Sequence, residues 1–585
     1  MAAVTPFALL LGLSLQAVPA ASADSCTTGR ISAVDIRNGT IFDEERADSA
    51  RHIGWAYRLA NRLHVRTRPW VIRRELLFGV GDCFDLFRLE ESERLLRATE
   101  FLSRATITSE QLEDGSHRVI VDTDDEWTTR VDVRVSAHGY GLRAVEENVL
   151  GSGQSLGLFY IDRDVTRDYG ASYYTPQLFG TRWDMRTEVG SSRAGTFVRE
   201  EISYPWVGEV SKWASLQSFR REDQFFDYIG SDDPELRAPR VLLPIREKSF
   251  NIAMLRRIGP TGNTALAGLA LGYQQISYPG IVELAPEGDF DQRMPADTAT
   301  QLAIAGQHAL RNNIRVFALF GHRTIEWVRR RGMDSMHGEE DVRLGAEMGI
   351  AVGRSLPSLE RDNDFYSTLS LYTGMELGPA LVIARVRGDG RRSLTARDDQ
   401  PEWEDFYGDG EILTYYRPGG NDHHLLFLRA SGIGAWNTRT PFQLTLGGER
   451  GVRGFDRERF PGGRRLVVNL EDRIYFGWPY PDVLDLGATV FADAGRMWPG
   501  DVPFGVSSGW QTSAGVGLRM SFPASSRVVY RADIAWPMTA GTGFGDFRLQ
   551  LSLGETIGMN PRSLDQQVVR SRPSGAAGQL FPFGR

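Results

Sequence analysis

The sequence predicts an antiparallel transmembrane β-barrel of sixteen strands with a small α+β domain in front of it. Three observations predict this fold: a leader-like N-terminus, the lack of an apolar run long enough for a membrane helix, and apolar–polar alternation over most of the chain. An exported chain can still span a membrane without helices, because a closed barrel satisfies its own backbone hydrogen bonds. The 585 residues suffice for one large barrel and an attached domain.

The N-terminal segment 1–23 has the features of a signal peptide. An apolar run from Phe7 to Leu15 precedes the small residues Ala21, Ser22 and Ala23, which fit a cleavage site before Asp24. Export places the two cysteines, Cys26 and Cys83, in an oxidising compartment, where they could form one disulfide. Two unpaired thiols are the alternative, and the sequence leaves both open.

Residues 28–130 are expected to fold as a separate unit with the order strand, helix, helix, strand, strand. The strands are expected at 31–37, 105–108 and 117–122, the helices after Pro69 and at 89–103, and a partly helical insertion at 43–65. The segment 71–76 and Gly81-Asp82 resemble a polypeptide-transport-associated (POTRA) domain. The resemblance implies a periplasmic docking module whose sheet edge pairs with an extended client strand. A plain spacer domain is the alternative.

Residues 131–554 are expected to form the barrel. In the last segments an almost purely apolar face opposes one with charges and glycines, as in a lipid-facing wall around a wet lumen. The alternating segments are 139–148, 155–162, 167–174, 181–189, 195–204, 212–221, 249–257, 264–277, 314–324, 341–352, 365–377, 380–386, 424–431, 465–476, 486–495, 513–522, 528–536 and 547–553. They outnumber the sixteen strands. The charged segment 386–410 is expected to be a loop, and 297–313 a helical insertion.

A glycine-rich stretch from Gly447 to Phe455 lies between two of the alternating segments. Its glycines relax the backbone enough for a loop to turn inward, and Arg453 could bond a carboxylate bidentately. Alternation places the side chains of Asn469, Glu471, Phe491 and Asp493 on the lumen face. An exposed hairpin with a solvated arginine is the competing interpretation.

Two motifs in this region resemble the BamA/TamA and two-partner-secretion superfamily. One is Leu446-Gly447-Gly448 followed by Val452-Arg453-Gly454-Phe455, and the other is Phe491-Ala492-Asp493-Ala494-Gly495. In that superfamily the loop folds back into the barrel and its arginine meets the aspartate of the second motif. The resemblance therefore implies that Arg453 pairs with Asp493, with Glu471 as a further acidic candidate.

The resemblance implies a non-enzymatic protein of the bacterial outer membrane that inserts or translocates polypeptides, with its POTRA-like domain in the periplasm. Its partners would be client polypeptides, outer-membrane lipid, and periplasmic or assembly proteins bound by that domain. The alternative is a passive porin or receptor on the same scaffold. The chain departs from the family in having one POTRA-like unit, and in its last strand, which ends near Leu553 before a tail, 555–585, expected to be flexible.

Several other functions are not supported. The net charge of −8 speaks against a nucleic-acid partner. Neither a P-loop nor a dinucleotide fingerprint occurs, so no cofactor is expected. His423-His424 has no further ligands at metal-site spacing, and no metal is expected. The G-x-S-x-G match at 505–509 lies in an expected loop rather than a strand-to-helix elbow, so it does not predict a hydrolase.

Overall fold

The structure is a computed structural model that describes most of the chain. The described residues are 26–42, 54–136, 139–163, 165–230, 239–357, 362–395, 402–420, 422–448, 450–480, 484–522, 524, 526–539, 543, 545–553 and 559. The signal peptide expected at 1–23 lies outside them. So does the expected tail, 555–585, except for Met559.

The N-terminal unit is a three-stranded sheet backed by helices. Strands β1 (Ile31–Gly39) and β2 (Leu102–Gln111) flank the central β3 (His117–Asp125), parallel and antiparallel to it respectively. Helix α3 (Pro69–Glu75) begins at a first-turn proline, and Asp85 caps α4 (Leu86–Arg97) by accepting from the N–H of Phe87. Helix α2 (Gly54–Leu63) lies in the insertion after β1. The core contains Ile31, Val71, Ile72, Leu76, Leu89, Leu96, Leu102, Val119 and Val121.

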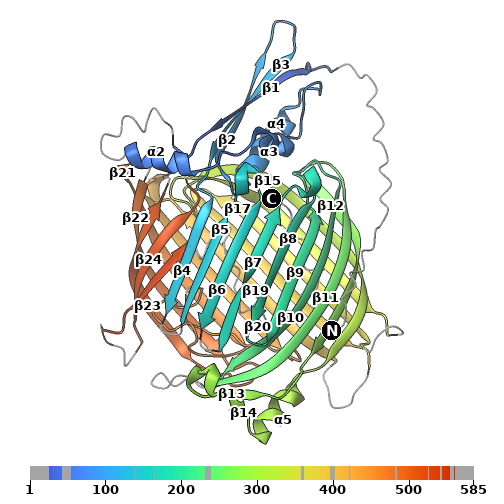
Figure 1. The fold of residues 1–585 in the computed structure, drawn as a ribbon, viewed down its shortest axis with the longest axis vertical. Helices are drawn as coiled ribbons and strands as arrows, with labels where there is room; N and C mark the ends of the chain where they lie inside the picture. Colours follow the sequence, from blue (N-terminus) through green and yellow to red (C-terminus); the bar gives the residue numbers. More distant parts are fainter. Residues whose placement is uncertain are drawn as a thin grey trace.

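The rest of the chain is an antiparallel barrel in which each long strand pairs with its neighbours in the sequence (Figure 1). Twenty long strands form the ring in the described part of the chain. They are β4 (Thr129–Ser136), β5 (Gly139–Glu146), β6 (Ser155–Arg163), β7 (Thr166–Thr175), β8 (Asp184–Ser192), β9 (Gly195–Tyr204), β10 (Trp213–Ile229), β11 (Arg240–Ile258), β12 (Asn263–Ser277), β15 (Arg311–Arg331), β16 (Glu339–Ser355), β17 (Asp364–Leu377), β18 (Ala380–Ser393), β19 (Trp403–Tyr416), β20 (His424–Trp436), β21 (Arg464–Tyr480), β22 (Leu484–Trp498), β23 (Gly509–Ser521), β24 (Val529–Pro537) and β25 (Arg548–Leu553).

The side chains of these strands alternate between the outside and the lumen. On β22, for example, Val490 is 54% exposed on the outer face, whereas Asp493 is 3% exposed inside. Asp472, an acidic residue of the outer face, lies 3.1 Å from the imidazole of His424 on β20. The ring closes where the two short terminal strands, β25 and β4, become neighbours. The barrel predicted from alternation is therefore confirmed.

The barrel has more strands than the expected sixteen, because each alternating segment predicted from the sequence overlaps a separate barrel strand. Two further strands, β4 and β19, did not stand out by alternation. The expectation of a loop at 386–410 was wrong: β18 extends to Ser393 and β19 starts at Trp403. The charges of this segment misled the prediction because they face other charged groups inside the lumen rather than water. The helical insertion expected at 297–313 contains helix α5 (Thr298–Gln307).

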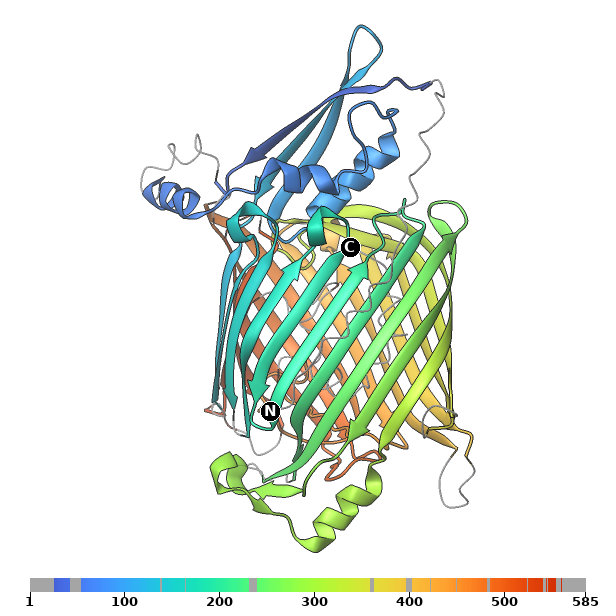
Figure 2. The same cartoon turned by 45° about the vertical axis from the view of Figure 1, so that its right-hand side comes forward.

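The two mouths of the barrel carry different elements (Figures 1 and 2). The N-terminal unit covers one, which we call the domain-side mouth. At the other, the far mouth, the connection between β12 and β15 forms an excursion of β13 (Glu283–Ala285), β14 (Met294–Pro295) and α5. None of the described helices is long and apolar enough to cross a membrane.

The N-terminal unit is held on the barrel rim by charged contacts from α4 and the residues after it. Arg97 donates two hydrogen bonds to Asp341 of β16, at 3.1 and 2.8 Å. Arg527, just before β24, donates to the backbone carbonyls of Arg97, Thr99 and Leu102. Burial opposes the charge on Arg97, but hydrogen bonding and charge from Asp341 outweigh it and raise the Arg97 pKa.

Glu91 of α4 makes a second kind of contact with the rim. Its carboxylate accepts from the backbone N–H of Glu209 at 2.6 Å and pairs with Arg94, whose guanidinium lies 4.1 Å from the ring of Trp327 on β15. Burial raises the Glu91 pKa, but Arg94 and the N–H of Glu209 outweigh it, so the pKa lies below its usual value of 4.5. The carboxylate therefore stays charged at neutral pH.

Candidate functional site

The long loop 437–463, between β20 and β21, packs against the inner wall of the barrel. Backbone bridges Leu444–Gly462 and Gly447–Val452 shape it. Its buried apolar side chains join residues of the wall in one cluster, which contains Phe442, Leu444, Leu446, Val452, Phe455, Phe460, Tyr407, Ala435, Val467 and Met497. This packing fixes the backbone that carries Arg453.

Arg453 is 2% exposed and is held by two strands at once. Its Nε and Nη2 donate to the two carboxylate oxygens of Asp493 on β22, each at 2.7 Å, and its backbone N–H donates to Oδ2 at 3.1 Å. Its Nη1 donates to Glu471 on β21 at 2.6 Å. The guanidinium carbon lies 3.6 Å from the ring centre of Phe491. A bidentate pair with a stacked ring fixes orientation as well as charge.

Two glycines make room for this contact. A Cβ on Gly495 of β22 would lie 2.7 Å from Val452 and 2.9 Å from Leu446, so the loop packs directly on the strand backbone there. Gly454 has φ of +89°, a conformation that favours glycine, in the residue after the arginine. The glycines therefore set how closely the loop approaches the wall.

A wider set of buried charges surrounds Arg453 on the last strands. Asp533 of β24 accepts from Arg519 at 2.6 Å and from Arg531 at 2.8 Å, and its carboxylate lies 3.7 Å from Arg453. Glu471 accepts from Arg473 at 3.0 Å. Removing one member of such a network leaves its partners buried without compensation, which is costly.

The residues predicted from the sequence occupy the following places. Val452, Arg453, Gly454 and Phe455 lie on the loop, and Phe491, Asp493, Gly495 and Glu471 lie on the wall against which it packs. Asn469 also faces the lumen and donates to Asp493 at 2.8 Å. Cys26 and Cys83 are joined by a disulfide with their Cα atoms 5.4 Å apart, in the N-terminal unit and remote from this contact.

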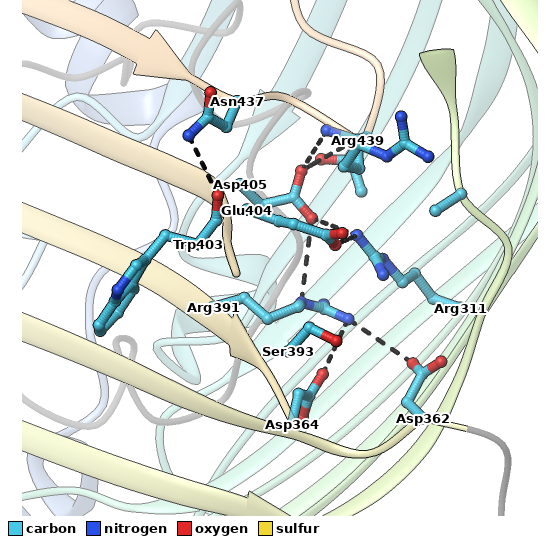
Figure 3. Close-up of polar contacts among 12 residues, drawn as sticks. Arg311, Asp362, Asp364, Arg391, Ser393, Trp403, Glu404, Asp405, Asn437 and Arg439 are labelled. Carbon is cyan, nitrogen blue, oxygen red and sulfur yellow. Dashed lines mark hydrogen bonds and ion pairs between the residues drawn. The ribbon is translucent and has the colours of Figure 1, made fainter. Parts of the chain in front are cut away.

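A second buried charge cluster, which sequence reasoning missed, anchors the start of the loop (Figure 3). Asp405 of β19 accepts from the backbone N–H groups of Arg439 and Thr440 at 2.7 and 2.9 Å. Arg311 donates to Asp405 at 2.9 Å, and Arg391 lies 3.9 Å from it. The further members are Arg315, Asp362, Asp364 and Glu404. The only signal in the sequence was the run of charges in 386–410.

The two charge clusters hold the loop against the barrel wall. In the G-x-S-x-G match the motif serine is Ser507. Its neighbour Ser508 accepts from the backbone N–H of Met497 at 2.9 Å and donates to the carbonyl of Gly509. Within the described residues, no group of His, Cys, Asp and Glu side chains could hold a metal ion.

Comparison with known proteins gives one family match and several similar folds. No curated protein matches the chain. Among solved structures, BamA from Haemophilus ducreyi lacking POTRA domains 1–3 is 11% identical with a TM-score of 0.35, covering 90% of this chain and 84% of that one. CdiB from Escherichia coli is 10% identical with a TM-score of 0.43, covering 92% and 93%. CdiB from Acinetobacter baumannii is 11% identical with a TM-score of 0.35, covering 90% and 74%.

The family model of the Omp85 superfamily domain matches residues 405–557. The match includes β19 to β25, and therefore the inserted loop, Arg453 and both of its carboxylate partners. The resemblance predicted from the two motifs is thus confirmed: residues 405–557, which carry both motifs, match the Omp85 superfamily domain.

Proposed function

We propose that this protein inserts polypeptides into the bacterial outer membrane or translocates them across it. The N-terminal unit, as a POTRA-like domain in the periplasm, captures an extended client, and the barrel provides the passage or templates the client's strands. Loop 437–463 acts as a latch in the lumen, and the pairing of Arg453 with Asp493 holds this loop in its closed position. Lipid, client polypeptides and assembly partners of the N-terminal unit are the partners. No cofactor takes part and no bond is made or broken.

The observation that carries the proposal is the buried contact of Arg453 with Asp493 and Glu471. A long loop packed in the lumen occupies space that a passive pore would leave to water. Its central arginine has two carboxylate partners, on β21 and β22. Burying an arginine with two carboxylates costs free energy unless all the hydrogen bonds between them form. The loss of one of these hydrogen bonds therefore weakens the whole contact. Such a contact suits a latch with a closed and an open state.

The shape of the N-terminal unit supports client capture. In its sheet only β3 is paired on both sides, so β1 and β2 are edge strands among the described residues. An extended polypeptide can add to such an edge through main-chain hydrogen bonds, largely independent of its sequence. The unit covers the domain-side mouth (Figure 2), so a client held there is next to the lumen entrance.

Depletion of the protein tests this function. After depletion, the inventories of outer-membrane and secreted proteins are compared with those of undepleted cells. We expect a defined set of clients to disappear from one of the two inventories and, for inserted clients, to accumulate in the periplasm. Unchanged inventories would overturn the proposal.

The passive porin or receptor makes the opposite predictions. It requires a sizeable open conductance of the purified protein in planar bilayers and no loss of other proteins on depletion. The packed loop speaks against an open pore, so we expect the intact chain to be closed most of the time.

A further inference from the structure

The hairpin of β15 and β16 extends beyond the barrel ring at the domain-side mouth. On its two sides, the pairing of β12 with β15 ends at Thr324, and the pairing of β17 with β16 ends at Gly345. The hairpin continues past both positions as residues 326–344, whose two strands pair only with each other in the described sheet. We call this segment the ribbon and its turn, 332–338, the tip.

Gly345 lies where the ribbon leaves the ring and allows it to bend there. Its φ of +110° is in the region that favours glycine. A Cβ at this position would overlap the carbonyl oxygen of Thr324 on the paired strand, so the two strands approach more closely than any side chain permits. Beyond this bend the ribbon leans over the mouth, and its tip reaches the lumen wall.

The tip is buried against lumen-facing side chains of β18 to β21 and β24. Met333 and Met336 pack in one apolar cluster with these side chains. The wall side of the cluster includes Leu381, Ile383, Leu413, Tyr415, Leu425, Phe427, Tyr475 and Val529. Arg473 of β21 donates to the carbonyl of Met333 at 2.9 Å, and the hydroxyl of Tyr415 donates to the carboxylate of Asp334 at 2.7 Å. The wall therefore binds the tip through apolar side chains and a main-chain carbonyl, groups that an extended polypeptide also offers.

Helix α4 of the N-terminal unit holds the other end of the ribbon. Arg97 donates to Asp341 of β16 at 2.8 Å, and Glu93 pairs with Arg329 of β15. The ribbon therefore connects the N-terminal unit to the lumen wall, and a displacement of α4 changes the contacts that hold the ribbon in place.

A cavity of about 570 Å³ opens beside the tip. Its lining includes Met333, Leu381 and Leu425 of the apolar cluster, together with arginines of the ribbon and of the turn between β19 and β20. A volume of this size is typical of ligand sites in proteins. Space for further apolar side chains therefore lies next to those of the tip, at the entrance to the lumen.

We propose that the wall cluster under the tip binds apolar side chains of an extended client, and that Met333 and Met336 occupy this site at rest. The ribbon then acts as a flap of the domain-side mouth that bends at Gly345. This inference rests on the proposed function, in which clients arrive from the N-terminal unit. A client docked there shifts α4 and releases the ribbon, and its own apolar side chains replace the two methionines. Flexible methionine side chains suit a contact that forms and breaks.

The tip also shares a partner with the latch. Arg473, which binds the carbonyl of Met333, donates to Glu471 at 3.0 Å, and Glu471 accepts from Arg453 at 2.6 Å. When the tip leaves the wall, Arg473 loses one acceptor and changes the charge environment of Glu471. Opening of the flap at the domain-side mouth therefore acts on the loop that enters from the far mouth.

Thiol labelling tests whether the tip is held in the wall. Both natural cysteines are in the disulfide, so Ser335→Cys, at a position 1% exposed, introduces the free thiol. Asp422→Cys, in an exposed turn at the same mouth, is the control. We expect a membrane-impermeant maleimide to label position 335 at least about tenfold more slowly, because labelling requires local opening. Adding Met336→Asp, which places a charge in the apolar cluster, should make the two rates similar. Equal rates without Met336→Asp, or slow labelling in its presence, would overturn the proposal.

A peptide tests the site in the absence of a client. The Met336→Asp protein, checked for its fold by heat-modifiable gel mobility, should open more often in planar bilayers than the unmodified protein. A synthetic peptide of residues 331–338 should close it again. The same peptide with Met333→Ser and Met336→Ser should need an at least about tenfold higher concentration, because it lacks the apolar side chains. Equal potency of the two peptides would show that the wall does not bind these side chains.

A crosslink between the tip and the wall tests the flap. His337→Cys and Asp485→Cys, whose natural side chains are in contact, are joined in cells by a short bis-maleimide. Arg331→Cys and Glu339→Cys, which face each other within the ribbon, provide the matched control, since this crosslink leaves the tip free. We expect the first crosslink to abolish client handling and channel openings, and the control to preserve both. Normal client levels with the tip crosslinked would overturn the flap, and would leave the proposed function standing if depletion still removes clients.

Discussion

At the scale of single residues, Arg453 is the buried charge on which the contact between the loop and the barrel wall depends. Its guanidinium bridges Asp493 and Glu471 while almost entirely withdrawn from water. Such a pair adds little net stability to the fold. Breaking it is costly, because each carboxylate left without its partner stays buried. We propose that the contact acts as a switch between a closed and an open state of the loop.

A double-mutant cycle measures this coupling. Arg453→Ala should destabilise the barrel by about 3–5 kcal/mol because it strands two buried carboxylates. Adding Asp493→Asn should restore part of that loss. The double variant should therefore lose less stability than the two single variants lose together. Denaturant unfolding of the protein in detergent provides the free energies. Strictly additive effects would show that the two side chains are not coupled.

The close approach of the loop can be disturbed without touching a charge. Gly495→Ala places a methyl group 2.7 Å from Val452, so the loop must shift, whereas Gly432→Ala on β20 meets its nearest atom only at 4.0 Å. We expect Gly495→Ala to cost about 1–3 kcal/mol and to increase protease cleavage within 437–463. Gly432→Ala should leave the cleavage pattern unchanged. The same pattern in both variants would refute the role of Gly495.

At the scale of elements, Arg527 joins the barrel to the N-terminal unit through three hydrogen bonds. It donates to three carbonyls at the C-terminal end of α4 and in the residues that follow, where backbone acceptors are left over. Arg527→Ala should loosen the unit on the rim, where the contacts of Arg97 and Glu91 remain. Spin labels at Glu113→Cys and Asp422→Cys should then give a broader distance distribution. Arg548→Ala on β25, exposed on the barrel, is the control, and identical distributions would contradict this contact.

The disulfide has a local effect. Cys26–Cys83 ties the segment before β1 to the segment before α4, within the N-terminal unit. Cys26→Ser should lower the stability of that unit by about 2–4 kcal/mol, whereas unfolding of the barrel should not change. Calorimetry with and without reductant separates the two transitions. A shift of the barrel transition would show that the unit and the barrel unfold together.

The elements also show how far a sequence predicts such a protein. Alternation located most strands because lipid and lumen impose opposite requirements on neighbouring side chains. Strand β19 was not predicted because its Glu404 and Asp405 pair with Arg311 and Arg391 from other strands. No local pattern in the sequence reveals such partners. The inward turn 332–338 between β15 and β16 was equally hidden, since the carbonyl of its Met333 accepts from Arg473, 140 residues away in the sequence.

At the scale of the molecule, the lumen is occupied from both ends. Loop 437–463 packs into it from the far mouth, and the turn 332–338 between β15 and β16 buries its Met333 and Met336 in it near the N-terminal unit. Charged contacts through Arg473 and Glu471 join the two. We propose that the barrel is closed at rest and opens when a client supplies replacement contacts. Such a population shift requires differential binding of the client to the two states.

The central claim is that the Arg453 contact serves client handling rather than barrel assembly. Its most direct test is complementation of depleted cells with Arg453→Ala, using Arg457→Ala, an exposed arginine of the same loop, as the control. Client levels in the outer membrane and the medium are measured together with heat-modifiable mobility of the variant. We predict that Arg453→Ala assembles as a barrel but leaves the clients missing, whereas Arg457→Ala restores them. Normal client levels with Arg453→Ala would contradict the account.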